Sequence, residues 1–368
     1  MIKNIIPCLD IRRQNIQLKD KIFLTLDKVF DQTAFSGGKY VEAFETSFSA
    51  YCSVPYAVGV NSGTSALHLM MIALGISAGD EVIVPANTFI ATAWAPSYVG
   101  ATPVFVDCTA DTWNIDPLQI EKRITSRTKA VIGVHLYGQP CDVDAIKTIC
   151  RRHNLYFLED AAQAQGAKYR GVRVGGFGEM AAFSFYPGKN LGACGEGGMV
   201  TTRNYEYTEH LKRLRNHGSE IRYYHEELGF NLRMDGLQGA ILDIKLDYLD
   251  QWNERRREIA NRYHQKITNP VVHWQKNPDW AESIYHLFVI TVDDRQKMLQ
   301  FLESKDIIPG LHYPVPCHLQ RAYAHLGYRS GDCPNAEYLS AHCLSLPMFP
   351  EMSEEEIERV VEAVNAYK

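Results

Sequence analysis

Short apolar runs alternate with helix-like segments through the first half of the chain. The apolar runs cover Tyr56–Val60, Glu81–Pro85, Pro103–Val106, Ala130–His135 and Tyr156–Leu158. The helix-like segments between them cover Ser65–Leu74, Ile90–Val99, Pro117–Ile124 and Val143–Arg152. Strands that are apolar throughout, rather than alternating, are typical of a parallel sheet buried on both faces. The pattern therefore predicts an α/β fold with a mostly parallel sheet between layers of helices.

The second half of the chain has a different pattern. Two more strands are expected at Met180–Phe185 and Met199–Thr201, followed by one long charged helix from Met234 to Ile267. The segments after this helix are a strand at His286–Val292, a helix at Gln296–Ser304, a Pro-rich loop at Gly310–Pro316 and a helix at Glu354–Ala366. A length of 368 residues fits two domains. We predict a large domain at 1–245 and a smaller α+β domain at 246–368.

Composition narrows the classes of function. The net charge is −5, which argues against a general nucleic-acid binder because such proteins carry a basic excess. Neither a signal peptide at the start nor a membrane span is expected from the distribution of apolar residues. The nine cysteines are scattered without a Cys-x-x-Cys pair, so we expect free thiols in the cytoplasm and no metal site.

One lysine lies in a glycine-bounded loop after a predicted strand. Lys189 stands between Gly188 and Gly192, so its side chain is expected to be accessible at the strand end. Its neighbour Cys194 is interpreted as a small filler rather than a nucleophile. A lysine amine can form a Schiff base with an aldehyde, and pyridoxal phosphate is the aldehyde most often held this way. Most lysines are solvated surface charges, so the hypothesis depends on other segments that serve the same cofactor.

A carboxylate closes the predicted strand Tyr156–Asp160. Ligands of open parallel sheets bind at the carboxyl ends of the strands. Asp160 can therefore pair with a protonated pyridine nitrogen, or it can cap the segment that follows it. Both readings stay open at this point. Glu159 is expected to point to the opposite face of the sheet.

A third segment offers a phosphate site. Ser62, Gly63 and Thr64 follow the strand Tyr56–Val60 and open a helix. Small hydroxyl residues at a helix N-terminus bind phosphate well, although the same residues also serve as ordinary helix caps. The segment matches neither the dinucleotide fingerprint nor a Walker loop. Three further candidates lie near strand ends: Ser184 for the phosphate, Phe89 for stacking on a planar ring and Gln163 for the ring hydroxyl.

Taken together, these segments resemble the DegT/DnrJ family of pyridoxal-phosphate sugar aminotransferases, which have the aspartate-aminotransferase-like fold (fold type I). The matching stretches are Gly59–Leu67, Asp80–Phe89, Glu159–Gln163, the Lys189 loop, Leu214–Gly218, Gly229–Met234 and His312–His318. They are spread over nearly the whole chain. The likeness is greatest to the subgroup that acts on dTDP-linked 3-keto-6-deoxyhexoses, through His135–Pro140, His312–His318 and Leu346–Pro350. The chain departs from the family pattern at Gln165, where histidine is frequent, and at Glu196, where aspartate is common.

The resemblance implies a role for each matching residue. Lys189 would be the Schiff-base lysine and proton shuttle, Asp160 the partner of the pyridine nitrogen, and Gln163 a neighbour of the ring hydroxyl. The phosphate would be held by Ser62, Gly63, Thr64 and Ser184, and Phe89 would stack on the ring. Asn231 would reach the phosphate of the neighbouring subunit's cofactor, which implies a homodimer. The substrate pocket would be lined by Tyr186, His312, Tyr313 and His318.

The implied reaction transfers the amino group of L-glutamate, through pyridoxamine phosphate, to a nucleotide-linked keto sugar in deoxyamino-sugar biosynthesis, such as that of lipopolysaccharide O-antigen. Amination at C4 instead of C3 is an alternative. The family's dehydratase branch carries histidine in place of the lysine, so Lys189 disfavours dehydration. A non-catalytic regulator that binds the cofactor on the same fold is disfavoured by Lys189, Asp160 and the His312–His318 loop together.

Overall fold

The computed structural model describes residues 5–368, which contain a central seven-stranded sheet. Its strands are β1 (Tyr56–Val60), β2 (Glu81–Pro85), β3 (Thr102–Val106), β4 (Thr128–Val134), β5 (Tyr156–Asp160), β8 (Met180–Ser184) and β9 (Gly198–Thr202). Their order is β1-β9-β8-β5-β4-β2-β3. Neighbours from β8 to β3 pair in parallel, whereas β9 is antiparallel to both β1 and β8. The predicted mostly parallel sheet is confirmed.

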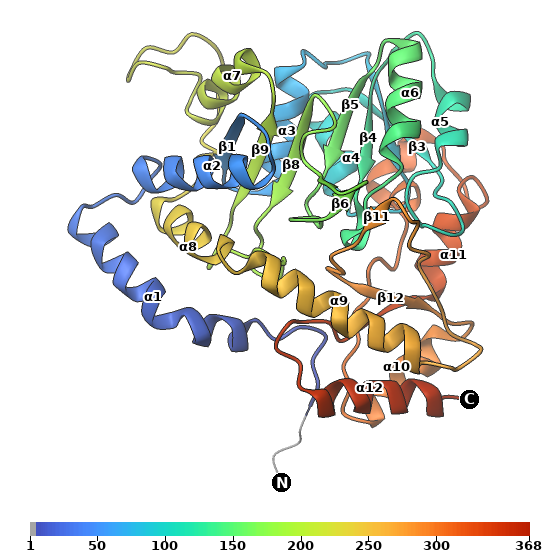
Figure 1. Ribbon diagram of the computed structural model, residues 1–368. Coiled ribbons are helices and arrows are strands. Elements are labelled where there is room, and N and C mark those ends of the chain that lie inside the picture. The colour runs from blue at the N-terminus through green and yellow to red at the C-terminus, as the bar shows by residue number, and fades with distance from the viewer. Residues whose placement is uncertain (1–4) are drawn as a thin grey trace.

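Helices cover both faces of this sheet (Figure 1). One face packs against α3 (Gly63–Ala73), α4 (Ala91–Tyr98) and α7 (Tyr205–Arg215). The other face packs against α2 (Lys39–Tyr51), α5 (Pro117–Arg123), α6 (Val143–His153) and α8 (Gly236–Leu246). Helix α1 (Ile11–Asp31) packs along α8 through Leu18 and Ile22. The strands are apolar throughout because both of their faces are buried in this way.

A second core lies below the large sheet, where the C-terminus is found in Figure 1. It is built on the three-stranded antiparallel sheet β10 (His273–Trp274), β12 (Phe288–Thr291) and β13 (Cys343–Leu346). Around it lie α9 (Leu249–Lys266), α10 (Arg295–Ser304) and α12 (Glu354–Ala366), with α11 (Pro334–His342) against the large core. Ile6 pairs with Ile307 and is buried in this second core. The segment at Ile6 thus packs with the C-terminal segments, and the boundary at 245/246 stays a prediction.

Short elements connect the two cores. A small sheet joins β6 (Lys168–Tyr169) to β7 (Val172–Arg173) and to β11 (Ala281–Glu282). Three 3-10 turns, η1 (Leu136–Gly138), η2 (Cys317–Leu319) and η3 (Arg321–Leu326), complete the elements. The nine cysteines are free, and no helix within residues 5–368 is long and apolar enough to cross a membrane.

The expectation of a single helix from Met234 to Ile267 is wrong. Helix α8 ends at Leu246 and α9 begins at Leu249. The two helices serve different cores: Leu242 packs beneath the large sheet, whereas Ile259 and Tyr263 pack in the second core. The segment is charged and favours helix throughout, so its sequence does not indicate where the helix is interrupted. The break between Leu246 and Leu249 arises because the two halves pack on different cores. The predicted helix Glu354–Ala366 is confirmed, with a capping box at Ser353 and Glu356.

Candidate functional site

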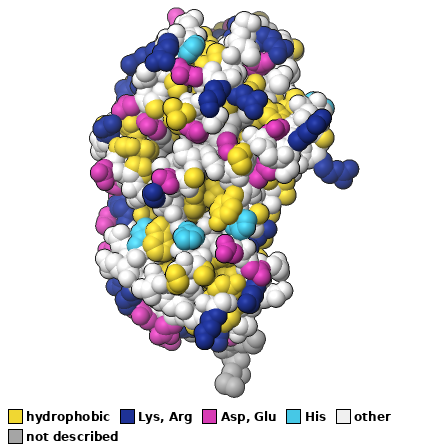
Figure 2. Space-filling model, turned by 90° about the vertical axis from the view of Figure 1, so that its right-hand side faces the viewer, with side chains coloured by type: hydrophobic (Ala, Val, Ile, Leu, Met, Phe, Trp, Pro, Cys, Tyr) yellow, Lys and Arg dark blue, Asp and Glu magenta, His cyan; other side chains and the backbone are white. Residues whose placement is uncertain are grey.

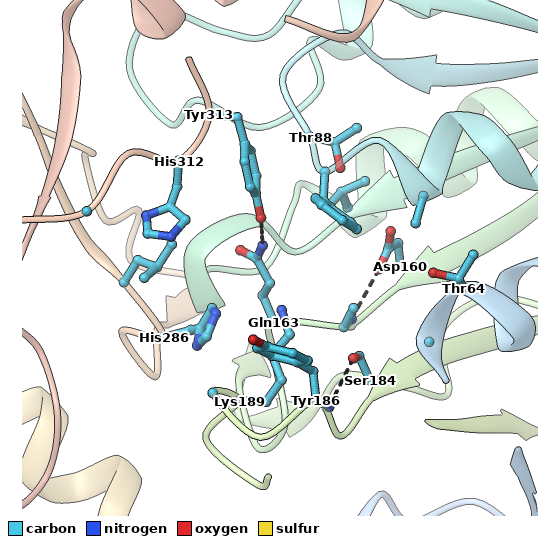
Figure 3. Close-up of a pocket in the computed structure, with 18 of the residues that line it drawn as sticks. Thr64, Thr88, Asp160, Gln163, Ser184, Tyr186, Lys189, His286, His312 and Tyr313 are labelled. Atoms are coloured by element: carbon cyan, nitrogen blue, oxygen red, sulfur yellow. Dashed lines mark hydrogen bonds between the residues drawn. The ribbon is translucent and has the colours of Figure 1, made fainter. Parts of the chain in front are cut away.

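A cavity of about 710 Å³ opens at the carboxyl edge of the large sheet, between the two cores. Its lining includes the ends of β5 and β8, the N-terminus of α3, the loop after β2 and the 310–313 segment. Figure 3 draws 18 of the lining residues around this space and labels ten of them. The lining contains these predicted site residues: Ser62, Gly63, Thr64, Phe89, Asp160, Gln163, Ser184, Tyr186, Lys189, His312 and Tyr313. Residues far apart in the sequence are thus brought together as a parallel sheet predicts.

One end of the cavity is the N-terminus of α3. Ser62 caps the helix, because its Oγ accepts a hydrogen bond of 3.1 Å from the Ser65 amide. Within residues 5–368, no hydrogen bond uses the amides of Gly63 and Thr64, so they remain free for an anion. A Cβ on Gly63 would lie 2.7 Å from Cβ of Ser184, so only glycine lets the helix end approach β8 this closely. Ser62 thus caps the helix, and the next two amides are left without a partner. Phosphate binding by this segment stays a prediction.

Asp160 lies in the middle of the cavity wall and is buried. Its Oδ2 accepts a hydrogen bond of 2.7 Å from Thr92 Oγ1, and its Oδ1 accepts one of 3.1 Å from the Ala162 amide. Burial raises the pKa of this carboxyl, while the bonds from Thr92 and Ala162 and the charge of Lys189 oppose the rise. The carboxylate thus makes a local turn and also presents its charge to the cavity.

Lys189 extends into the cavity from the loop after β8 (Figure 3). Its side chain is half-buried, in contrast to the accessible position expected from the sequence. Burial lowers its pKa to about 8, and the negative charge of Asp160 offsets part of that effect. At neutral pH roughly a tenth of such an amine is neutral, far more than for an ordinary lysine. The neutral form is the one that attacks a carbonyl carbon.

The opposite wall is aromatic and polar. Gln163 is held between two partners, because its Oε1 accepts from the Tyr137 amide at 2.7 Å and its Nε2 donates to the Tyr313 hydroxyl at 2.9 Å. Phe89, 48% exposed, meets Tyr313 with ring centroids 5.6 Å apart, so a flat ring could be covered from this side. Tyr186, 55% exposed, lies beside Lys189 in the cavity (Figure 3).

Glu159 points away from the cavity, as the strand alternation predicts. Its two oxygens accept hydrogen bonds from His135 Nε2 and from the amides of Gly175, Phe177 and Gly178. Burial is the largest single effect and tends to raise the pKa of this carboxyl, but these donors together hold it below its ordinary value. Two adjacent acidic residues thus have separate tasks, one structural and one in the cavity.

The structure does not place two predicted residues in the cavity. His318 is only 1% exposed, its Nε2 is 3.1 Å from Glu337 Oε1, and its ring packs against Phe105 and Tyr328. The expectation that His318 lines the substrate pocket is therefore corrected: the 310–318 loop turns inward after Tyr313. Asn231 is exposed on the surface outside the cavity, so its predicted role depends on a second subunit.

Sequence reasoning misses the roles of two cavity residues, His286 and Glu196, and of the buried Thr92 behind the cavity wall. Thr92 follows the helix start on α4 and looks like an ordinary helical threonine, yet it donates to Asp160. The sequence pattern predicts a strand that begins at His286, yet this side chain lies beside Lys189 in the cavity. Glu196 was noted only as a departure from the family pattern, and it also lines the cavity. No local sequence pattern marks Thr92 or His286, because tertiary packing alone brings them to these positions.

The donor set fits pyridoxal phosphate. Free amides at the α3 N-terminus suit its phosphate, the Asp160 carboxylate suits its ring nitrogen, and the Lys189 amine with its lowered pKa suits its aldehyde. The charge pattern also agrees with a small anionic ligand rather than a polymer, since acidic and basic side chains are interspersed over the face in Figure 2. Within residues 5–368, no cluster of side chains could hold a metal ion. The fold and this cavity define a pyridoxal-phosphate enzyme of the aminotransferase type.

The family follows from comparison with known proteins. The model of the "DegT/DnrJ/EryC1/StrS aminotransferase family" matches residues 17–365, and the chain belongs to that family. Solved members of this fold include forms with pyridoxal phosphate and with pyridoxamine phosphate, and pyridoxal 5′-phosphate is the cofactor of this chain.

Three relatives are similar over nearly their whole length. A dTDP-3-amino-3,6-dideoxy-alpha-D-galactopyranose transaminase of Aneurinibacillus thermoaerophilus is 47% identical, covering 98% of this chain and 99% of the relative. A pleiotropic regulatory protein of Geobacillus stearothermophilus is 44% identical, covering 98% of this chain and 97% of the relative. The crystal structure of DesV from S. venezuelae, in complex with a ketimine intermediate, has a TM-score of 0.96 and is 43% identical, covering 98% of both chains.

Proposed function

We propose that this protein transfers the amino group of L-glutamate to the keto group of a nucleotide-linked deoxy sugar. The observation that carries the proposal is the placement of Lys189 and Asp160 in one cavity with the free amides of Gly63 and Thr64. The cavity volume of about 710 Å³ leaves room for a substrate larger than an amino acid, and Tyr186 and His312 also line the cavity.

The chain's own residues supply binding, orientation and proton transfer. When it is bound, the cofactor supplies an electron sink that stabilises negative charge next to the reacting carbon. The α3 amides and Ser184 would hold its phosphate, and Asp160 would keep its ring nitrogen protonated. Lys189 Nζ would take a proton from the amino donor's α-carbon and return it at the cofactor carbon that bears the nitrogen. Proton transfer by a positioned group of this kind contributes roughly 10²–10⁴ in rate.

We infer the finer substrate from the similar transaminases. The relative from Aneurinibacillus thermoaerophilus supports a dTDP-linked 3-keto-6-deoxyhexose as the acceptor, giving a 3-amino-3,6-dideoxyhexose. Amination at C4 is the alternative. The test is incubation of the cofactor-loaded protein with L-glutamate and a panel of nucleotide keto sugars, followed by assignment of the amine position by NMR. Amination at C3 of the dTDP sugar supports this substrate, amination at C4 selects the alternative, and no aminated product from any sugar contradicts the function.

A regulatory role on the same fold is the second candidate. The relative described as a pleiotropic regulatory protein, 44% identical, favours it. The complete set of cofactor and proton-transfer residues in this chain favours the enzyme, since a protein that only binds the cofactor does not need a Lys189 amine with a lowered pKa. Turnover by the wild type together with loss of turnover in Lys189→Ala would decide for the enzyme.

We also propose that the active unit is a homodimer with shared sites. Asn231 lies on an exposed segment next to the cavity edge of the sheet, because neighbouring Arg233 bridges to Val60 and the Leu232 carbonyl accepts from the Asn61 amide. Asn231→Ala should weaken cofactor retention without changing the melting temperature of the cofactor-free protein. A fully active monomer in size-exclusion chromatography would contradict the shared site.

We also propose a location in the cell and a biosynthetic role for this protein. A cytoplasmic location agrees with the nine free cysteines. A role in assembling a deoxyamino sugar for lipopolysaccharide O-antigen agrees with the proposed product. Fractionation of cells, and sugar analysis of a strain that lacks the protein, test these two points separately.

A further inference from the structure

His286 is a cavity residue for which the proposed chemistry has no role so far. It lies beside Lys189 in the loop before β12 (Figure 3). Its Nδ1 is 3.2 Å from Oδ1 of Asn190, the residue next to Lys189. Within residues 5–368, the other ring nitrogen, Nε2, makes no hydrogen bond, although the ring lines the cavity. Which nitrogen carries the proton therefore decides what this side chain offers to a ligand.

The side-chain amides of Asn253 and Asn190 determine which nitrogen of His286 carries the proton. The first of them is Asn253 on α9. One amide atom of Asn253 lies 2.9 Å from the backbone carbonyl of Gln165, in a fully buried contact. A carbonyl oxygen only accepts, so this atom must be the NH₂ group of Asn253. The other atom, which faces Asn190 at 2.8 Å, must then be the oxygen Oδ1.

The same reasoning fixes Asn190. One of its amide atoms lies 2.8 Å from Asn253 Oδ1 and 3.2 Å from the Ile284 carbonyl, which are two acceptors. This atom must therefore be the NH₂ group, and the atom that faces His286 is the oxygen. An oxygen needs a donor, so the proton of His286 lies on Nδ1 and points at Asn190.

The ring is also neutral. Burial and the positive charges of Lys189 and Arg256 hold the pKa of His286 well below its ordinary value. A neutral ring with its proton on Nδ1 leaves a lone pair on Nε2. His312 differs in this respect, because its Nδ1 is 2.8 Å from the Ser345 hydroxyl, which can donate or accept and so fixes no tautomer.

We propose that His286 is a substrate-binding residue that accepts a hydrogen bond through Nε2 from a hydroxyl of the sugar, with Asn190 and Asn253 as positioning residues. The inference rests on the proposed function for the identity of the substrate. A neutral lone pair repels phosphate and carboxylate oxygens, so it selects a donor, and the sugar hydroxyls are the donors that the acceptor substrate brings. The arrangement also couples the Lys189 loop, α9 and the loop before β12 through one set of hydrogen bonds.

A kinetic comparison tests the assignment. In the cofactor-loaded protein, His286→Leu should raise KM for the keto sugar about tenfold, the factor expected for one lost hydrogen bond. Absorbance of the bound cofactor and the half-reaction with L-glutamate should not change. His286→Gln, which can present a carbonyl oxygen, should recover part of the loss, and the exposed His325→Gln is the matched control. An unchanged sugar KM in His286→Leu overturns the proposal, and so does an equal loss in the glutamate half-reaction.

A spectroscopic measurement does not depend on turnover or on a variant that folds. In the wild type labelled with ¹⁵N-histidine, His286 should show protonated Nδ1 and unprotonated Nε2 at neutral pH, and the Nε2 signal should shift when the keto sugar is added. A proton on Nε2, or a doubly protonated ring, overturns the proposal. If the wild type aminates no keto sugar, the proposed function fails, but the ¹⁵N signals still report whether the proton of His286 is on Nδ1. If it does aminate one and the sugar leaves Nε2 unchanged, only this inference fails.

Discussion

A Cβ atom placed on Gly63 would lie 2.7 Å from Cβ of Ser184, closer than real Cβ atoms approach. Gly63→Ala should therefore push the α3 end away from β8 and weaken cofactor affinity at least about tenfold, because the amides and Ser184 no longer converge on one phosphate. Titration of the cofactor-free protein with pyridoxal phosphate measures this. Ser184→Gly removes both the clashing Cβ and the hydroxyl, so alone it should weaken binding. In that background Gly63→Ala should reduce the affinity by a smaller factor than in the wild type. A double variant weaker than the sum of the two single changes would contradict this steric explanation.

Thr92 is expected to keep Asp160 ionised. Its hydroxyl donates to Asp160 Oδ2, and this bond lowers the pKa of a carboxyl that burial raises. Valine has nearly the same shape as threonine but no hydroxyl donor, so the pKa of Asp160 should rise in Thr92→Val. When the pH is lowered, this variant should therefore lose activity at a higher pH than the wild type. At neutral pH the rate should fall roughly tenfold. The pH profile of kcat in wild type and Thr92→Val measures the effect. If kcat falls at the same acidic pH in both proteins, Thr92 does not set the pKa of Asp160.

Glu159 is expected to stabilise the fold rather than the reaction. Glu159→Gln replaces one of the two carboxylate oxygens by an NH₂ group, which faces hydrogen-bond donors instead of accepting from them. The free energy of unfolding should therefore fall by about 3 kcal/mol or more. The folded pKa lies below the ordinary 4.5, so this stabilisation is complete above that pH and is lost as the pH falls through the folded value. Urea unfolding at fixed protein concentration measures the difference. The partly exposed Glu121→Gln should change stability by no more than about 1 kcal/mol, and an equal effect of the two changes would be evidence against the assignment.

The charge of Asp160 is expected to raise the pKa of Lys189. In the cofactor-free protein the amine should titrate at about 8, well below an ordinary lysine. Asp160→Asn removes the negative charge, so the pKa should fall further. Reductive ¹³C-methylation followed by an NMR titration measures both values, and Lys189→Met identifies the signal. A Lys189 pKa near 10.5, or one unaffected by Asp160→Asn, would show that burial and the carboxylate do not act on this amine.

The sequence predicted the sheet and most of the cavity for a physical reason. Buried parallel strands are apolar throughout, and their carboxyl ends meet at one edge, so Asp160, Ser184 and the 62–64 segment had to lie together. Long-range packing had no such local signal. The bend between Leu246 and Leu249, the inward turn of His318 toward Glu337, and the position of His286 all follow from contacts between distant segments.

The most direct measurement is to locate the lysine that carries the cofactor. Borohydride makes the bond between a lysine and pyridoxal phosphate permanent, and peptide mapping then identifies the lysine. We expect the label on Lys189. The rival is Lys245, a buried lysine near this loop, whose Nζ already donates to the Gly192 carbonyl at 2.8 Å. Label on Lys245 or another lysine, or no label on protein saturated with cofactor, would contradict the central role of Lys189.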